Sequence, residues 1–119
     1  MRTWAVLVMA VTILAGCVTV TRKDMRLVEQ GYTYVEHNDY ENAEKCFKDA
    51  LAANPKNPYA LLNLGVVYQN SGRCDVAKQY YQQVLDLGGK EVADKSPDSN
   101  IRGKPLVEIA KKNLERCSE

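Results

Sequence analysis

The sequence predicts an all-α protein, a solenoid of two helix-turn-helix repeats followed by a C-terminal capping helix. Residue types in the first half of the chain recur 34 positions later, a period typical of helical repeats. Apolar residues within each copy are spaced three and four apart, which places them on one helix face. The recurring pairs are Leu27 and Leu61, Gly31 and Gly65, Tyr34 and Tyr68, Ala43 and Ala77, Phe47 and Tyr81, and Leu51 and Leu85.

The first repeat is predicted to cover residues 24–57 and to contain two helices joined by the polar turn at residues 37–39. Small residues at Gly31 and Ala43 allow the two helices to approach closely. Asn54-Pro55 ends the second helix, because the residue before a proline is disfavoured in the helical conformation. The core-facing residues are Leu27, Gly31 and Tyr34 in the first helix and Ala43, Phe47, Ala50 and Leu51 in the second.

The second repeat is predicted to cover residues 58–90. Pro58 suits the first turn of its first helix, where a missing backbone N–H costs nothing. Gly89 occupies the place where the first copy has Pro55, and it also ends a helix.

The two copies resemble the tetratricopeptide repeat, whose pattern is Trp/Leu-x2-Leu-Gly-x2-Tyr, then Ala-x3-Phe, then Pro. The resemblance implies paired antiparallel helices and a protein-binding function. The matching residues are Leu27, Gly31, Tyr34, Ala43, Phe47 and Pro55 in the first copy, and Leu61, Leu64, Gly65, Tyr68, Ala77 and Tyr81 in the second.

Residues 91–104 are predicted to form a loop that is long for a connection within a compact domain. We expect a helical turn at Lys90–Lys95, where this loop begins. The loop is interpreted either as a contact for a partner or as a mobile connector. It precedes the capping helix, predicted at residues 105–117 with Pro105 in its first turn and packed on the second helix of repeat two. The apolar stripe of this helix comprises Leu106, Ile109, Ala110 and Leu114.

Antiparallel stacking places Cys74, at the start of the last repeat helix, beside Cys117, at the end of the cap. We therefore predict a disulfide that staples the cap to the repeat, the alternative being two unrelated thiols. Cys46 precedes the core residue Phe47 and is interpreted as a free, small apolar filler.

Residues 1–16 are predicted to be a cleaved signal peptide, with a charged start, a short apolar core and small residues before the cut. Leu14-Ala15-Gly16-Cys17 resembles the lipobox of bacterial lipoproteins, which implies a lipidated Cys17 followed by a tether over residues 17–23. Val18, where an Asp would resemble an inner-membrane retention signal, favours the periplasmic face of the outer membrane. The alternative is an ordinary cleaved signal that contains a cysteine.

Charge and motif content exclude several function classes. Removing Arg2 with the signal peptide takes the 16 basic residues to 15, which equals the number of acidic residues. Nucleic-acid binding needs a clustered basic surface, so it is not expected. We find no catalytic constellation, metal-ligand spacing or phosphate loop, and therefore expect no enzyme activity, cofactor, metal or small-molecule substrate. His37 is predicted to be an exposed turn residue.

The resemblance implies that the first helix of each repeat lines a concave groove for a protein or peptide partner. The implied residues are Met25, Val28, Tyr32, Val35, Tyr59, Leu62, Val66, Gln69 and Asn70. Val28 and Tyr32 stand where family members that hold a terminal carboxylate have Lys and Asn; only Asn63 fits that clamp, so an apolar partner is favoured. The leading hypothesis is a lipid-anchored adaptor of the cell envelope, with pilus, secretion and outer-membrane assembly as candidate settings. A self-associating module, including a homodimer, and an accessory subunit of a cell-wall enzyme are the alternatives.

Overall fold

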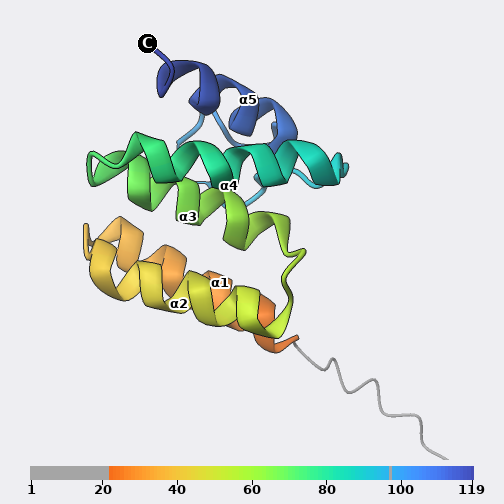
Figure 1. Ribbon diagram of the computed structural model, residues 1–119. Coiled ribbons are helices and arrows are strands. Elements are labelled where there is room, and N and C mark those ends of the chain that lie inside the picture. Colours follow the sequence, from red (N-terminus) through yellow and green to blue (C-terminus); the bar gives the residue numbers. More distant parts are fainter. Residues whose placement is uncertain (1–21, 97) are drawn as a thin grey trace, which may run out of the picture.

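The computed structural model describes residues 22–96 and 98–119, and within them the chain forms five helices arranged as a layered stack (Figure 1). The helices are α1 (Lys23–Glu36), α2 (Tyr40–Ala53), α3 (Pro58–Asn70), α4 (Cys74–Leu87) and α5 (Leu106–Arg116). The only extended pairing in the described residues is an isolated antiparallel bridge between Val92 and Pro105. The predicted all-α repeat fold is therefore confirmed. The predicted signal peptide and Cys17 lie outside the described residues.

Local sequence explains where the helices begin and end. The Asp39 and Asn57 side chains accept hydrogen bonds from the backbone N–H groups of Asn42 and Ala60, which caps α2 and α3 at their starts. Pro58 opens α3, and Gly88 ends α4 in the left-handed conformation with a φ of 60°.

Two glycines determine how closely the helices of each repeat pack. A Cβ atom on Gly31 would lie 2.6 Å from Cε1 of Phe47, and one on Gly65 would lie 2.5 Å from Cε1 of Tyr81. Each aromatic ring therefore packs directly against the backbone of the neighbouring helix. Phe47 and Tyr81 are both fully buried. The residue types that recur after 34 positions in the sequence therefore form the same glycine–aromatic contact in each repeat.

The structure corrects two details of the predicted C-terminal segment. The expected helical turn at Lys90–Lys95 is absent, because Val92 is extended and bridges to Pro105. Pro105 precedes the first turn of α5 as its N-cap residue, so the capping helix begins one residue later than predicted. Among the described residues, no helix combines the length and apolarity that crossing a bilayer requires.

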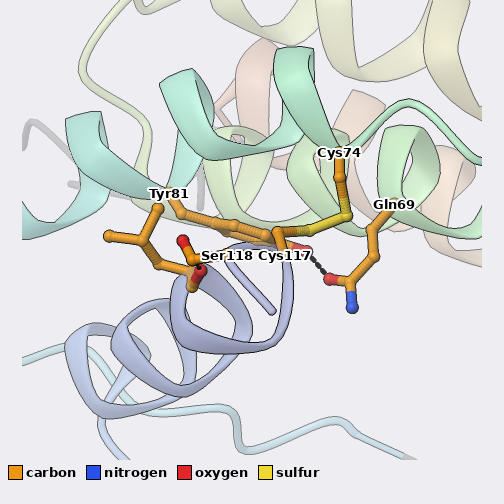
Figure 2. The surroundings of a disulfide bond; sticks show 6 residues. Gln69, Cys74, Tyr81, Cys117 and Ser118 are labelled. Atoms are coloured by element: carbon orange, nitrogen blue, oxygen red, sulfur yellow. Dashed lines mark hydrogen bonds between the residues drawn. A yellow bond between two sulfur atoms is a disulfide. The ribbon is translucent and has the colours of Figure 1, made fainter.

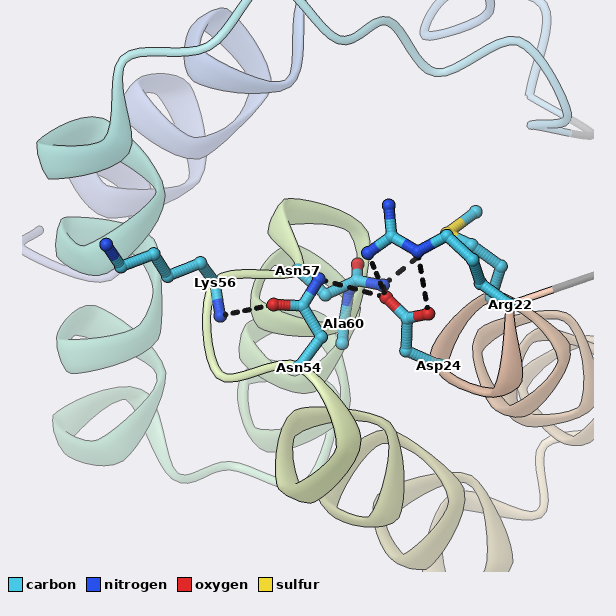
Figure 3. Close-up of polar contacts among 7 residues, drawn as sticks. Arg22, Asp24, Asn54, Lys56, Asn57 and Ala60 are labelled. Atoms are coloured by element: carbon cyan, nitrogen blue, oxygen red, sulfur yellow. Dashed lines mark hydrogen bonds and ion pairs between the residues drawn. The ribbon is translucent and has the colours of Figure 1, made fainter.

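A buried carboxylate fastens the start of α1 to the connection between α2 and α3 (Figure 3). Asp24 accepts hydrogen bonds from the side-chain amides of Asn54 and Asn57, both at 3.0 Å, and forms an ion pair with Arg22 at 2.8 Å. Burial by itself raises the pKa of Asp24, but these hydrogen bonds and the Arg22 charge outweigh it and lower the pKa to about 2.

We expect this carboxylate to make stability depend on acid. Because the folded-state pKa of Asp24 lies below its ordinary value of 3.8, the stabilisation is complete above about pH 4 and is lost as the pH falls through 2. Urea unfolding of wild type and Asp24→Asn between pH 2 and 6 checks this. The difference in unfolding free energy between the two proteins should shrink as the pH falls. A constant difference would contradict the assignment.

Candidate protein-interaction surface

The surface implied for partner binding lies on α1 and α3, the first helices of the two repeats, and the structure leaves little of it open. Val28 and Leu62 are buried, at 7% and 5% exposure, so they cannot line an open groove. Asn70 is exposed. The remaining members are half-buried: Met25, Tyr32, Val35, Tyr59, Val66 and Gln69.

The loop at residues 91–104 is held together by its own backbone. The N–H of Ala93 donates to the carbonyl of Lys104, and the N–H of Gly103 donates to the carbonyl of Ala93, both at 2.9 Å. The N–H of Leu106 donates to the carbonyl of Glu91, also at 2.9 Å, and ties the loop to the start of α5. The loop is therefore a hydrogen-bonded element, which the sequence, lacking any periodic pattern here, did not indicate.

This loop lies against the implied groove. The Tyr59 hydroxyl donates to the carbonyl of Val92 at 3.4 Å, and Lys95 forms an ion pair with Glu29 of α1 at 3.2 Å. Burial raises the pKa of Tyr32, and the side chains of Ser96, Arg102 and Asp98 are close enough to influence it as well. The loop thus covers the groove from the start of α3 to the middle of α1.

The predicted groove is therefore not open along its whole length, because Val28 and Leu62 are buried and the loop contacts Tyr59 and Glu29. The far end of the groove is formed by Val35, near the end of α1, and by Gln69 and Asn70, at the end of α3. None of these side chains forms a hydrogen bond or an ion pair with the described residues of the loop. Gln69 is itself engaged, because its side-chain oxygen accepts the hydroxyl of Tyr81. Val35 and Asn70 remain as the open end of the concave face.

The loop contacts lead to a prediction about hydrogen exchange. Lys95→Ala removes a pair whose two side chains are exposed, so it should lower the free energy of unfolding by less than about 1 kcal/mol. The amides of Ala93 and Gly103 should nevertheless stay protected, because their acceptors are backbone carbonyls within the loop. Amide exchange measured by NMR checks both; fast exchange at these two amides in the wild type would contradict the described loop.

One N–H of Asn63, the residue that fits a carboxylate clamp, is already used within α3. Its side-chain amide donates to the carbonyl of Tyr59 at 2.8 Å, one turn earlier in α3. Val28 is buried where the clamp has a basic residue. The geometry therefore agrees with the sequence in disfavouring recognition of a peptide's terminal carboxylate.

The end of the stack is closed by α5. A disulfide joins Cys74 at the start of α4 to Cys117 just after α5, as the antiparallel arrangement predicts, with the two Cα atoms 5.3 Å apart (Figure 2). Leu106, Ile109 and Ala110 are buried in the common core. The cap thus covers an apolar face of α4 that would otherwise be free to attract a further repeat.

The remaining sequence candidates carry little chemistry. Cys46 is buried and free, and burial raises the pKa of its thiol. His37 is exposed, with its Nδ1 atom 2.7 Å from the carbonyl of Thr33. No group of three or more His, Cys, Asp or Glu side chains that could hold a metal ion occurs in the part of the chain that the structure describes.

Paired antiparallel helices with small residues under aromatic rings, stacked and then capped, define a helical-repeat protein of the kind that binds other proteins. The chain belongs to the tetratricopeptide repeat family: residues 28–92, more than half of the chain, match the model of this family. Domains of this family are protein-interaction modules and are generally not catalytic.

Known proteins with similar sequences have diverse descriptions. The chain is 34% identical to TPR repeat-containing protein MJ1428 of Methanocaldococcus jannaschii over 58 residues, 49% of this chain and 10% of that protein. It is 30% identical to Photosystem I assembly protein Ycf3 of Prochlorococcus marinus over 82 residues, 60% of this chain and 43% of that protein. Protein O-mannosyl-transferase F38B6.6 of Caenorhabditis elegans is 28% identical over 89 residues, 75% of this chain and 11% of that protein. The chain spans less than half the length of each.

Proposed function

We propose that this protein is a lipoprotein of the bacterial cell envelope that recruits a protein partner to a membrane. The observation that carries the proposal is the combination of a capped tetratricopeptide repeat domain with a Leu14-Ala15-Gly16-Cys17 lipobox a few residues before it. The domain supplies protein binding, and Cys17 supplies the anchor.

The anchor requires more than one acyl chain. A single chain holds a protein to a bilayer only marginally, whereas two or more give stable attachment. A diacylglyceryl thioether on Cys17, with an amide-linked chain on its new amino group after cleavage, meets this requirement. Val18 supports attachment to the periplasmic face of an outer membrane.

The partner is proposed to be a protein or peptide that contacts the open end of the concave face. Val35 and Asn70 lie there, and Tyr40 beside them offers an aromatic side chain whose hydroxyl lies 3.5 Å from the Asn70 amide. Aromatic, aliphatic and amide groups together suit an apolar segment with a few backbone hydrogen bonds. A role in envelope assembly, for example of a pilus, a secretion channel or the outer membrane, is consistent with the assembly role named for one relative.

We expect Cys17→Ala to release the protein from the membrane fraction. The wild-type protein should sediment with membranes, incorporate an alkyne-labelled fatty acid and show the mass of an acylated chain that begins at Cys17. Cys46→Ala is the matched control, because it also removes one cysteine but should leave attachment and labelling unchanged. A wild-type mature chain without acyl groups would contradict the anchor.

Analytical ultracentrifugation of the detergent-solubilised full-length protein separates the adaptor from the alternative of self-association. The adaptor hypothesis predicts a monomer over the micromolar range. A stable dimer that is broken by a substitution at Asn70 would replace the separate partner with a second copy of the chain.

A further inference from the structure

The chain enters the helical stack at one edge, where α1 begins, and the proposed lipid anchor precedes this point in the sequence. Since neighbouring helices run antiparallel, α1, α3 and α5 begin at this edge, and α2 and α4 end there (Figure 1). Asp24 links the start of α1 to Asn54 and Asn57 between α2 and α3. The Tyr59 hydroxyl then links the start of α3 to Val92.

The covalent length of the tether limits how far this edge can lie from a membrane. Four residues lie between Cys17 and Arg22, so the distance between them is five residue steps, which span at most about 18 Å when the chain is fully extended. If Cys17 is acylated, as the proposed function holds, this edge is held near the lipid headgroups. The opposite edge, which carries the 37–39 and 71–73 turns and the C-terminus, is at the far end of the helices.

The side chains at this edge fit such a position. Among the described residues, the exposed large hydrophobic side chains are Leu87 at the end of α4, 38% exposed, and Val92 five residues later, 37% exposed. Both lie at the edge where the tether begins. Single exposed apolar residues are ordinary on protein surfaces. The location of Leu87 and Val92 at the same edge is therefore the observation that supports the inference.

Exposed basic residues also lie at this edge. Lys23 at the start of α1, Lys56 before α3 and Lys90 after α4 are all exposed. Glu91 and Asp94 lie near Tyr59 at the same edge, while Asp24 is buried and already paired with Arg22. Lysine stems can lie along an apolar surface while their ammonium groups reach the phosphates of lipid headgroups.

We propose that this edge docks on an anionic phospholipid bilayer through Leu87 and Val92 and through the exposed lysines Lys23, Lys56 and Lys90. Docking orients the domain with the helices pointing away from the membrane. The open end of the concave face, at Val35 and Asn70, then faces away from the bilayer, where a partner can reach it.

Tryptophan fluorescence provides a direct test, because the single tryptophan, Trp4, is removed with the predicted signal peptide. Leu87→Trp and Val92→Trp are made separately in the full-length chain, each giving a mature protein with one tryptophan. The purified acylated proteins are placed in phosphatidylethanolamine–phosphatidylglycerol vesicles that contain lipids brominated near the headgroup. Glu119→Trp at the opposite edge is the matched control.

We expect brominated lipid to reduce the fluorescence of Leu87→Trp and Val92→Trp by about half or more, because an interfacial apolar side chain lies about 5–10 Å into the headgroup–acyl boundary. Glu119→Trp should not be quenched. Replacing phosphatidylglycerol with phosphatidylcholine should weaken the quenching, and equal quenching would overturn the role of the lysines.

The outcomes separate the docked edge from the anchor itself. If mass spectrometry finds the acyl chains but neither edge tryptophan is quenched, docking is overturned while the proposed anchor stands. If the chains are absent from the wild-type protein, the proposed function fails and the docking inference fails with it. Quenching of Glu119→Trp to the same extent would also overturn the orientation.

Discussion

Replacing Tyr81 with alanine is expected to lower the free energy of unfolding by about 3–5 kcal/mol, the range for removing a large buried aromatic side chain. The Tyr81 ring is fully buried and lies directly against the backbone of Gly65. Its hydroxyl donates a hydrogen bond to the side-chain oxygen of Gln69. The substitution therefore opens a cavity between α3 and α4 that the tightly packed backbones cannot close.

Urea unfolding of the soluble chain, residues 17–119 with Cys17→Ser, measures this effect. Tyr80→Ala is the matched control: Tyr80 is half-buried and stacks on Tyr68 with ring centroids 5.6 Å apart, so its loss should cost about 1 kcal/mol. Tyr81→Phe keeps the ring and should lose only the hydrogen bond, again about 1 kcal/mol. Equal costs for Tyr81→Ala and Tyr80→Ala would contradict the described packing.

Removing the disulfide is expected to have the second largest effect. The bond between Cys74 and Cys117 closes a loop of 43 residues, which the chain-entropy account values at about 2–4 kcal/mol. The double variant Cys74→Ser, Cys117→Ser should therefore melt at a lower temperature than the oxidised wild type. We expect α5 to unfold first in this variant, because the disulfide ties the end of that helix to α4.

Limited proteolysis locates the effect within the chain. We expect cleavage within residues 98–119 to appear in the double variant and in the reduced wild type, while residues 23–87 stay resistant. Cys46→Ala, which removes a buried but unpaired cysteine, should change neither the cleavage pattern nor the dependence on reductant. Uniform cleavage along the whole chain would contradict this account, because it would mean that α5 does not become accessible before the two repeats do.

Much of the fold could be predicted because the same packing contact occurs in both repeats. Gly31 with Phe47 and Gly65 with Tyr81 are the same contact at two places, and a fixed offset makes it visible in the sequence. The pairing of Cys74 with Cys117 followed from helix direction alone. These features depend on spacing along the chain, which a sequence displays.

The candidate surface could be predicted only in part, because the loop at residues 91–104, which covers part of it, has no periodic sequence pattern. Nothing in residues 91–104 indicates that Lys95 reaches Glu29 or that Val92 meets Tyr59, more than thirty residues away in each case. The buried state of Val28 and Leu62 was missed for a related reason: the family pattern says which face they occupy but not what else packs there. The Asp24 cluster likewise joins side chains distant in sequence.

The measurement that tests the central claim most directly is photo-crosslinking in living cells, with a photoreactive amino acid at Val35 or Asn70 of the full-length chain. Gln79, exposed on α4, is the control position. A lipid-anchored protein-binding module predicts one dominant foreign protein crosslinked from Val35 and Asn70, absent from Gln79 and reduced by Cys17→Ala. Adducts of the chain with itself alone, or no adducts from either position, would contradict the account.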